Sequence, residues 1–277
     1  MHLTNVLLLA IYGAIIGLGL GRPFVASGVD HDQLGRVSQQ GARYPDKLMD
    51  RASPASRAPQ IKRLTPARPR QIELADPSLA ATAAKRKQLT YLVRCALPPD
   101  VELYAQYGSE RFTFPGSIGL APHWLTQAMT PREERWVSAC LLAYVNYFGK
   151  HVRISIRATH PPVPELEASD DERKTYTIAE GGFFGNLFLP QPVAYTCLSA
   201  RTPAQAADPI LQDRVCTQAT GATRADNKPI TRCRFVVTGR CEDASSFTVD
   251  GTSYREVIFT YLKPTRPSPG RTGEHER

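Results

Sequence analysis

The sequence predicts an α+β domain, a single compact unit of about seven short, mainly antiparallel strands around one central buried helix, cross-linked by disulfides. Three observations support this class. One helix has clear start signals, near residue 131. Several short β-rich segments are bounded by glycine, proline or polar residues. Six cysteines, an even number, occur behind a hydrophobic N-terminus.

The chain of 277 residues begins with an uncharged apolar run, Asn5–Gly21. Its length lies between the core of a signal peptide and a membrane-spanning helix. Small residues follow at Val25, Ala26 and Ser27, as a cleavage site would require. Residues 1–27 are therefore predicted to be either a signal peptide cleaved near Ser27 or an N-terminal membrane anchor. Both alternatives predict an extracytoplasmic protein, whether periplasmic, cell-surface or secreted.

Residues 28–87 are predicted to be a disordered basic linker, because they are rich in proline, arginine and alanine and lack a regular apolar period. Within it, 78–87 could form a short alanine-rich helix. Residues 1–87 hold 13 Lys and Arg against 6 Asp and Glu, whereas residues 88–263 hold 18 of each. The neutral folded part argues against a nucleic-acid-binding surface. A second disordered tail is expected at 264–277, which leaves 88–263 as the folded domain.

The best-supported element is a helix that begins after Thr130. Thr130 and Glu133 have the spacing of a capping box, and Pro131 occupies the first helical position, where proline is favoured. Apolar residues follow at helical spacing as far as Phe148, so the helix is predicted to be largely buried. Gly149 is expected just past its C-terminus.

The remaining elements are predicted strands. The segment 88–97, QLTYLVRCAL, is interpreted as a buried strand, because it is apolar and rich in β-formers. Further strands are expected within 101–108, 111–116, 151–158, 174–180, 192–200, 233–239 and 254–263. An extended acidic loop is expected at 159–173.

The cysteines decide which chemistry the domain carries. All six are predicted to form disulfides, because export and an even count favour pairing and no C-x-x-C or H-x₃-H spacing indicates a metal site. No metal and no cofactor are therefore expected. Cys95 and Cys140 both precede the acidic loop, so they are predicted to pair. Three connectivities stay open for the other four: Cys197, Cys216, Cys233 and Cys241.

An enzymatic alternative centres on Ser117. The segment PGSIG, residues 115–119, resembles a G-x-S-x-G nucleophile elbow in which proline replaces the first glycine. A secreted serine hydrolase would use Ser117 as nucleophile and His123 or His160 as base. The competing interpretation is a glycine-rich turn, and it is preferred because no helix is predicted directly after the serine.

The segment AEGGFFGNLF, residues 179–188, combines three glycines with three phenylalanines. One interpretation is a recognition loop formed by Phe183, Phe184, Asn186 and Phe188. The alternative is an aromatic turn packed against the core, which the usual burial of phenylalanine favours. No catalytic residue is assigned in either case.

Three stretches, YLVRCALP, WVSACLLAYVNYFG and EGGFFGNLF, together resemble a family of uncharacterised exported bacterial proteins with the same landmarks. The resemblance covers residues 88–200 approximately. It implies export and paired cysteines, and it implies no activity.

These observations predict an extracytoplasmic binding or structural protein rather than an enzyme. One version is an accessory subunit tethered to a membrane complex by its N-terminal helix. The expected partner is a protein or another cell-envelope component, with membrane contact through Asn5–Gly21. The alternative function is the secreted serine hydrolase.

Overall fold

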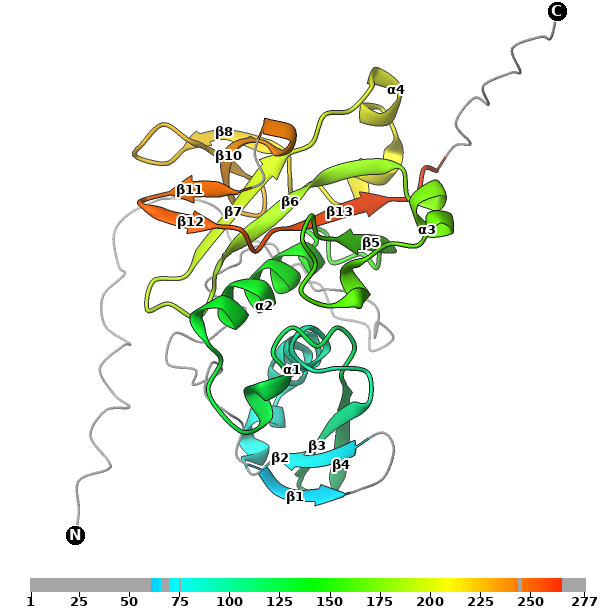
Figure 1. The fold of residues 1–277 in the computed structure, drawn as a ribbon, viewed down its shortest axis with the longest axis vertical. Coiled ribbons are helices and arrows are strands. Elements are labelled where there is room, and N and C mark those ends of the chain that lie inside the picture. The colour runs from blue at the N-terminus through cyan, green and yellow to red at the C-terminus, as the bar shows by residue number, and fades with distance from the viewer. Residues whose placement is uncertain (1–60, 66–69, 75, 244–245, 266–277) are drawn as a thin grey trace, which may run out of the picture. The chain divides into compact units, whose positions relative to one another are not determined.

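The computed structural model describes residues 61–65, 70–74, 76–243 and 246–265. The predicted leader, residues 28–60 of the predicted linker and residues 266–277 of the predicted tail lie outside the described residues. Helices and sheets are combined in the described part, which confirms the α+β class (Figure 1). All six cysteines are paired, so the domain is cross-linked by three disulfides.

The largest sheet has seven strands in the order β5-β13-β6-β7-β10-β9-β8. Its neighbours are antiparallel except for the parallel pair β7 and β10. The strands are β5 (Ile154–Arg157), β6 (Ile178–Asn186), β7 (Val193–Leu198), β8 (Ala219–Thr223), β9 (Pro229–Thr231), β10 (Val236–Arg240) and β13 (Ile258–Leu262). A separate hairpin consists of β11 (Phe247–Val249) and β12 (Thr252–Tyr254).

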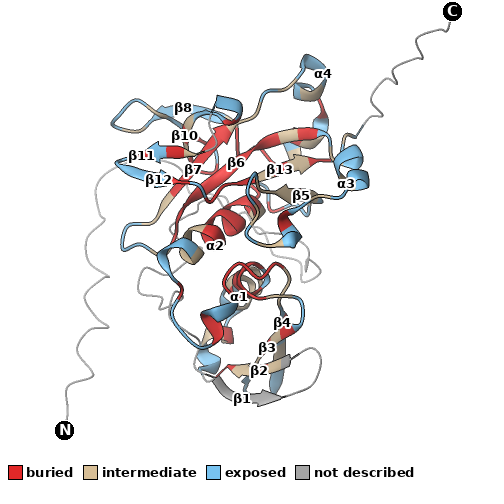
Figure 2. Ribbon diagram, in the orientation of Figure 1, coloured by how far each residue is buried: buried red, intermediate tan, exposed pale blue. Residues whose placement is uncertain are grey.

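Helix α2 (Pro131–Tyr144) is the predicted central helix, and it packs against β6 and β13. The capping box is present, since the Thr130 hydroxyl accepts from the backbone of Glu133 and the Glu133 carboxylate accepts from the backbone of Thr130. Residues 136–143 are all buried, and Figure 2 shows α2 in red beyond its exposed N-terminal turn. The helix ends one turn earlier than predicted, because Asn146 turns the chain with its own side-chain hydrogen bonds.

The predicted strand at 88–97 is wrong, because this segment belongs to helix α1 (Ala83–Ala96). The Thr82 hydroxyl caps its first turn by accepting from the backbone of Lys85. Leu89, Leu92 and Val93 are buried at the three- and four-residue spacing of a helix face. The segment is rich in β-formers, but its apolar residues follow the period of a helix. That period is clear only when the residues before 88 are included.

A second sheet has the order β1-β2-β3-β4, and its first two strands precede the predicted start of the domain. Its strands are β1 (Ile61–Thr65), β2 (Arg70–Leu74), β3 (Val101–Tyr107) and β4 (Glu110–Pro115). Strand β2 pairs in parallel with β3, and Ile72 and Leu74 are buried. The linker prediction is therefore wrong for the described residues from 61 to 87. Strand β2 reaches the core through two alternating apolar residues, too few to stand out in a basic, proline-rich context.

Short helices lie in the connections between these elements. They are η3 (Pro77–Ala80), η4 (Pro122–Leu125), η5 (Pro164–Leu166), α3 (Asp170–Thr175), α4 (Pro203–Ala206), η6 (Pro209–Asp213) and η7 (Cys241–Asp243). Two of them fall within the predicted acidic loop. The predicted tail begins in contact with η6. Thr265 donates from its hydroxyl and its backbone to Asp208, the residue that caps η6.

Candidate functional site

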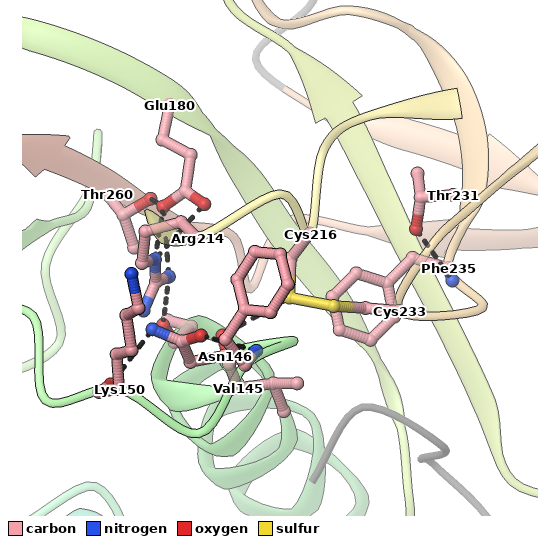
Figure 3. The surroundings of a disulfide bond; sticks show 12 residues. Val145, Asn146, Lys150, Glu180, Arg214, Cys216, Thr231, Cys233, Phe235 and Thr260 are labelled. Atoms are coloured by element: carbon pink, nitrogen blue, oxygen red, sulfur yellow. Dashed lines mark hydrogen bonds and ion pairs between the residues drawn. A yellow bond between two sulfur atoms is a disulfide. The ribbon is translucent and has the colours of Figure 1, made fainter. Parts of the chain in front are cut away.

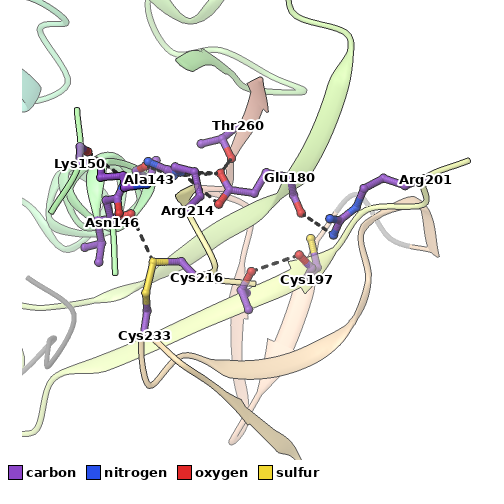
Figure 4. Close-up of polar contacts among 12 residues, drawn as sticks. Ala143, Asn146, Lys150, Glu180, Cys197, Arg201, Arg214, Cys216, Cys233 and Thr260 are labelled. Carbon is purple, nitrogen blue, oxygen red and sulfur yellow. Dashed lines mark hydrogen bonds and ion pairs between the residues drawn. A yellow bond between two sulfur atoms is a disulfide. The ribbon is translucent and has the colours of Figure 1, made fainter. Parts of the chain in front are cut away.

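A buried ion pair lies between the large sheet and the C-terminal end of α2. Glu180 of β6 and Arg214 both have almost no exposed surface, and their closest nitrogen and oxygen atoms are 2.9 Å apart. Thr260 of β13 donates to the Glu180 carboxylate at 2.7 Å. Arg214 also donates to the carbonyl of Ala143 at 2.8 Å, in the last turn of α2 (Figure 4). The pair therefore joins the sheet to the helix end and satisfies one of its orphan carbonyls.

The ion pair is enclosed, so we assign it a structural role. A buried charge that loses its partner is strongly destabilising, because neither water nor another group replaces the lost interaction. Both charged side chains and the Thr260 hydroxyl already have partners within the protein. The network therefore fixes the position of the chain around Arg214 and the end of α2.

Immediately after α2, Asn146 shapes a tight loop. Its side chain is buried and uses both ends of its amide: the nitrogen donates to the carbonyl of Lys150, and the oxygen accepts from the backbone of Phe148. Gly149 takes a φ of +68°, which favours glycine. The Tyr147 backbone donates to the carbonyl of Arg214 at 3.4 Å, which ties the loop to the ion-pair segment.

The disulfide Cys216–Cys233 lies beside this loop (Figure 3). The Cys216 sulfur is 3.4 Å from the carbonyl oxygen of Val145, the residue that follows α2. Residues on either side of the bridge, Val215 and Arg234, have left-handed backbone conformations, with φ of +46° and +63°. Such conformations are unusual for these residue types and persist where the surrounding structure fixes them. The bridge thus holds Arg232, next to Cys233, close to the helix end.

These elements present a surface group that we call the aromatic–basic patch, made of Tyr147, Phe148, Lys150 and Arg232. Tyr147 is half-buried against the core, and the other three side chains are exposed. The rings of Tyr147 and Phe148 meet edge to face with centroids 5.0 Å apart. The Lys150 ammonium lies 5.7 Å from the Phe148 ring centre, and the Arg232 guanidinium lies 5.9 Å from that of Tyr147. Phe148 is 40% exposed, and Lys150 also forms an ion pair with Asp213.

The patch was missed by sequence analysis because the helix was extended through Phe148, which placed that ring on the buried face. Asn146 was the available signal, since asparagine favours helix ends and turns over helix interiors. The fully buried pair of Glu180 and Arg214 had no sequence signal, because the two residues are 34 positions apart.

The predicted recognition loop is wrong as a loop. Phe183, Phe184 and Asn186 lie on β6 and are buried, while Phe188 is half-buried just beyond it. The ring of Phe184 stacks on Phe247 at 4.8 Å between centroids. Asn186 donates to Glu134 of α2, and its side-chain oxygen accepts from the backbone of Phe188. The packing alternative is therefore right about burial, but the segment is a central strand of the core and not a turn.

The cysteines pair as Cys95–Cys140, Cys197–Cys241 and Cys216–Cys233. The first is the pairing that the sequence predicted, and it joins α1 to α2. The other two bridges form one of the three connectivities that the sequence left open. Cys95, Cys140, Cys197, Cys216 and Cys233 are completely buried.

Ser117 lies in a turn that closes the end of α1. Its backbone donates to the carbonyl of Leu97, while Ile118, Leu120 and Ala121 donate to the carbonyls of Arg94, Cys95 and Ala96. The segment therefore satisfies the carbonyls that the helix end would leave without partners. Within the described residues, no hydrogen bond joins Ser117 to His123 or His160. His123 instead lies 3.7 Å from Glu133.

A polar cluster joins the tips of two hairpins. Arg224 donates to Asp226 and to Asp250, and the Tyr195 hydroxyl donates to Asp250 at 3.3 Å. Hydrogen bonding to Arg224 lowers the pKa of both aspartates below their ordinary value. Burial raises the pKa of Tyr195 to about 12. The cluster holds two turns together.

No protein-family model, curated protein or solved structure matches the chain. Among the described residues, no helix is long and apolar enough to span a membrane. In that same part of the chain, no three histidine, cysteine or acidic side chains converge as metal ligands.

Proposed function

We propose that the protein is an extracytoplasmic binding protein whose disulfide-bonded domain presents the aromatic–basic patch to a component of the cell envelope. Three intramolecular disulfides fit an oxidising, extracytoplasmic compartment. The observation that carries the proposal is the buried support beneath the patch: Asn146 and the Cys216–Cys233 bridge hold the exposed Phe148 ring beside the half-buried Tyr147 ring. Binding sites are typically built in this way, from exposed groups on a rigid framework.

The competing hydrolase is disfavoured by the surroundings of Ser117. A nucleophile needs a base within hydrogen-bonding reach, and an elbow serine sits between a strand and a helix. Here the serine belongs to a turn that is bonded along the end of α1. Labelling with a fluorophosphonate probe tests this directly. Modification that is lost in Ser117→Ala would support the hydrolase and contradict the binding proposal.

Photo-crosslinking in intact cells tests the patch itself. A photoreactive phenylalanine analogue at position 148 should form adducts, because Phe148 is exposed beside the proposed partner. The matched control is position 107, since Tyr107 is 44% exposed but lies on β3 of the other sheet. Equal adducts at both positions, or none at 148, would contradict the proposal.

We further propose that the uncleaved Asn5–Gly21 segment tethers the protein to a membrane complex. N-terminal sequencing of the mature protein distinguishes this form from a cleaved one. A mature chain beginning near residue 28 would contradict the tether and leave the binding proposal intact.

A further inference from the structure

The aromatic–basic patch combines an exposed apolar ring with cations placed beside it. Phe148 is one of three large hydrophobic side chains that are most exposed among the described residues. Lys150 and Arg232 each lie within 6 Å of one ring of the pair. An apolar ring flanked by lysine and arginine is the composition that suits the interface of an anionic membrane, where aromatic rings and basic side chains both partition.

The polar groups around the rings are already committed. The Asn146 amide is bonded within its own loop at both ends, and the Asp213 carboxylate pairs with Lys150. A sugar or a peptide is recognised by directional donors and acceptors placed around an apolar contact. The patch provides ring surface and the exposed guanidinium of Arg232, which a layer of phosphate headgroups can use without fixed directions.

We propose that the aromatic–basic patch docks on the headgroup layer of an anionic phospholipid bilayer. Phe148 inserts among the upper acyl carbons, Tyr147 lies at the interface, and Arg232 meets phosphate groups, while Lys150 stays paired with Asp213. This inference rests on the proposed binding function and names its partner. It goes beyond a tether at Asn5–Gly21, because it places the folded domain itself on the membrane.

The patch is small, and the segment before the domain adds little positive charge to it. Residues 1–60 hold 6 Lys and Arg against 4 Asp and Glu. Two rings and the Arg232 guanidinium bind weakly by themselves. A membrane tether upstream raises the local concentration of bilayer and makes such weak docking effective.

The test places a fluorophore at the patch, because the N-terminal segment could bind vesicles by itself. Phe148→Trp and, as control, Tyr107→Trp are made in the full chain and mixed with vesicles that contain brominated phosphatidylcholine, with or without phosphatidylglycerol. Brominated chains quench a tryptophan only on contact. The two native tryptophans, Trp124 and Trp136, are buried and give the baseline in the unsubstituted protein.

The proposal predicts quenching at position 148 with anionic vesicles, and much less at 107 or with neutral vesicles. Arg232→Gln in the Phe148→Trp background should weaken docking about fivefold, because a basic side chain near an anionic surface contributes about 1 kcal/mol. The matched control is Arg132→Gln, at the opposite end of α2. Raising the salt to about 1 M, which shortens the screening length to about 3 Å, should weaken docking further.

Equal quenching at 107 and 148, quenching that ignores lipid charge, or no quenching at 148 would each overturn the membrane proposal. The binding function would survive such a result if the photo-crosslinker at 148 still captured a protein. If neither quenching nor crosslinking occurred at position 148, both the membrane proposal and the binding function would be overturned.

Discussion

Two adjacent aromatic pairs in this chain have opposite positions. Phe183 and Phe184 lie on β6 with no exposed surface, whereas Tyr147 and Phe148 follow α2 in a loop and Phe148 is 40% exposed. The sequence predicted Phe148 on the buried face of the helix, and for Phe183 and Phe184 it left a recognition loop open beside the favoured packed turn. What decides the outcome is the element that carries each pair: a central strand has neighbours on both edges, whereas a loop past a helix end has packing on one side only.

The glycines beside the buried pair allow that segment to pack closely as a central strand. A Cβ on Gly182 would lie 2.7 Å from the Cys197 sulfur, and one on Gly185, whose φ is +143°, would lie 2.2 Å from the Val193 carbonyl oxygen. The glycines allow β6 to approach β7 and its disulfide closely. They are required for packing between strands, which a single sequence cannot distinguish from the flexibility of a loop.

The largest expected effect comes from the ion pair that anchors the end of α2. Glu180→Gln leaves Arg214 buried beside a neutral partner, so we expect a loss of about 3–5 kcal/mol in the free energy of unfolding, measured by urea denaturation. Glu180→Gln combined with Arg214→Met removes both charges and should cost clearly less than the two single changes added. Additive losses would show that the two charges do not stabilise each other.

Phe184→Ala should cost about 3–5 kcal/mol, because it opens a cavity among Tyr195, Phe247 and Tyr254. The same substitution at Phe148 should change the free energy of unfolding by less than about 0.5 kcal/mol, as expected at the surface. Urea denaturation of both variants compares the two regions directly. Similar losses in both would remove the distinction between a core pair and a surface pair.

Cys140→Ser should destabilise the domain by about 2–5 kcal/mol, because the Cys95–Cys140 bridge joins α1 to α2 across 45 residues. Cys95→Ser should cost a similar amount, and the double variant much less than the sum, since one bond cannot be lost twice. Thermal melts of the three variants measure this. A thiol titration of the denatured, unreduced wild type should find no free thiol.

The smallest effect concerns the exposed hairpin tips. Arg224 lowers the pKa of Asp226 and Asp250, so the charged forms are favoured by folding. Their contribution to stability is complete above the ordinary aspartate pKa of about 4 and is lost as the pH falls below it. Hydrogen exchange in both hairpins should therefore rise at low pH in the wild type and be less sensitive to acid in Arg224→Gln. The same acid response in both proteins would exclude a role for Arg224.

How much of this structure the sequence predicts depends on how far apart along the chain the interacting residues lie. The start of α2 was predicted to the residue, because Thr130, Pro131 and Glu133 determine it within four positions. The partner of Cys95 followed from its order along the chain. Strands β3 and β4 were predicted, whereas β1, β2 and the patch were missed, because they depend on β2 pairing with β3 and on Arg214 reaching Ala143, 71 positions away.

The central claim is that Phe183 and Phe184 stabilise the fold, whereas Tyr147 and Phe148 bind a partner. Phe148→Ala in the full chain tests it most directly, by urea denaturation and by competition with the crosslinker-bearing protein for its adducts in cells. We predict an unchanged unfolding midpoint and a loss of competition. A midpoint that falls as in Phe184→Ala, or competition equal to that of the wild type, would contradict the claim.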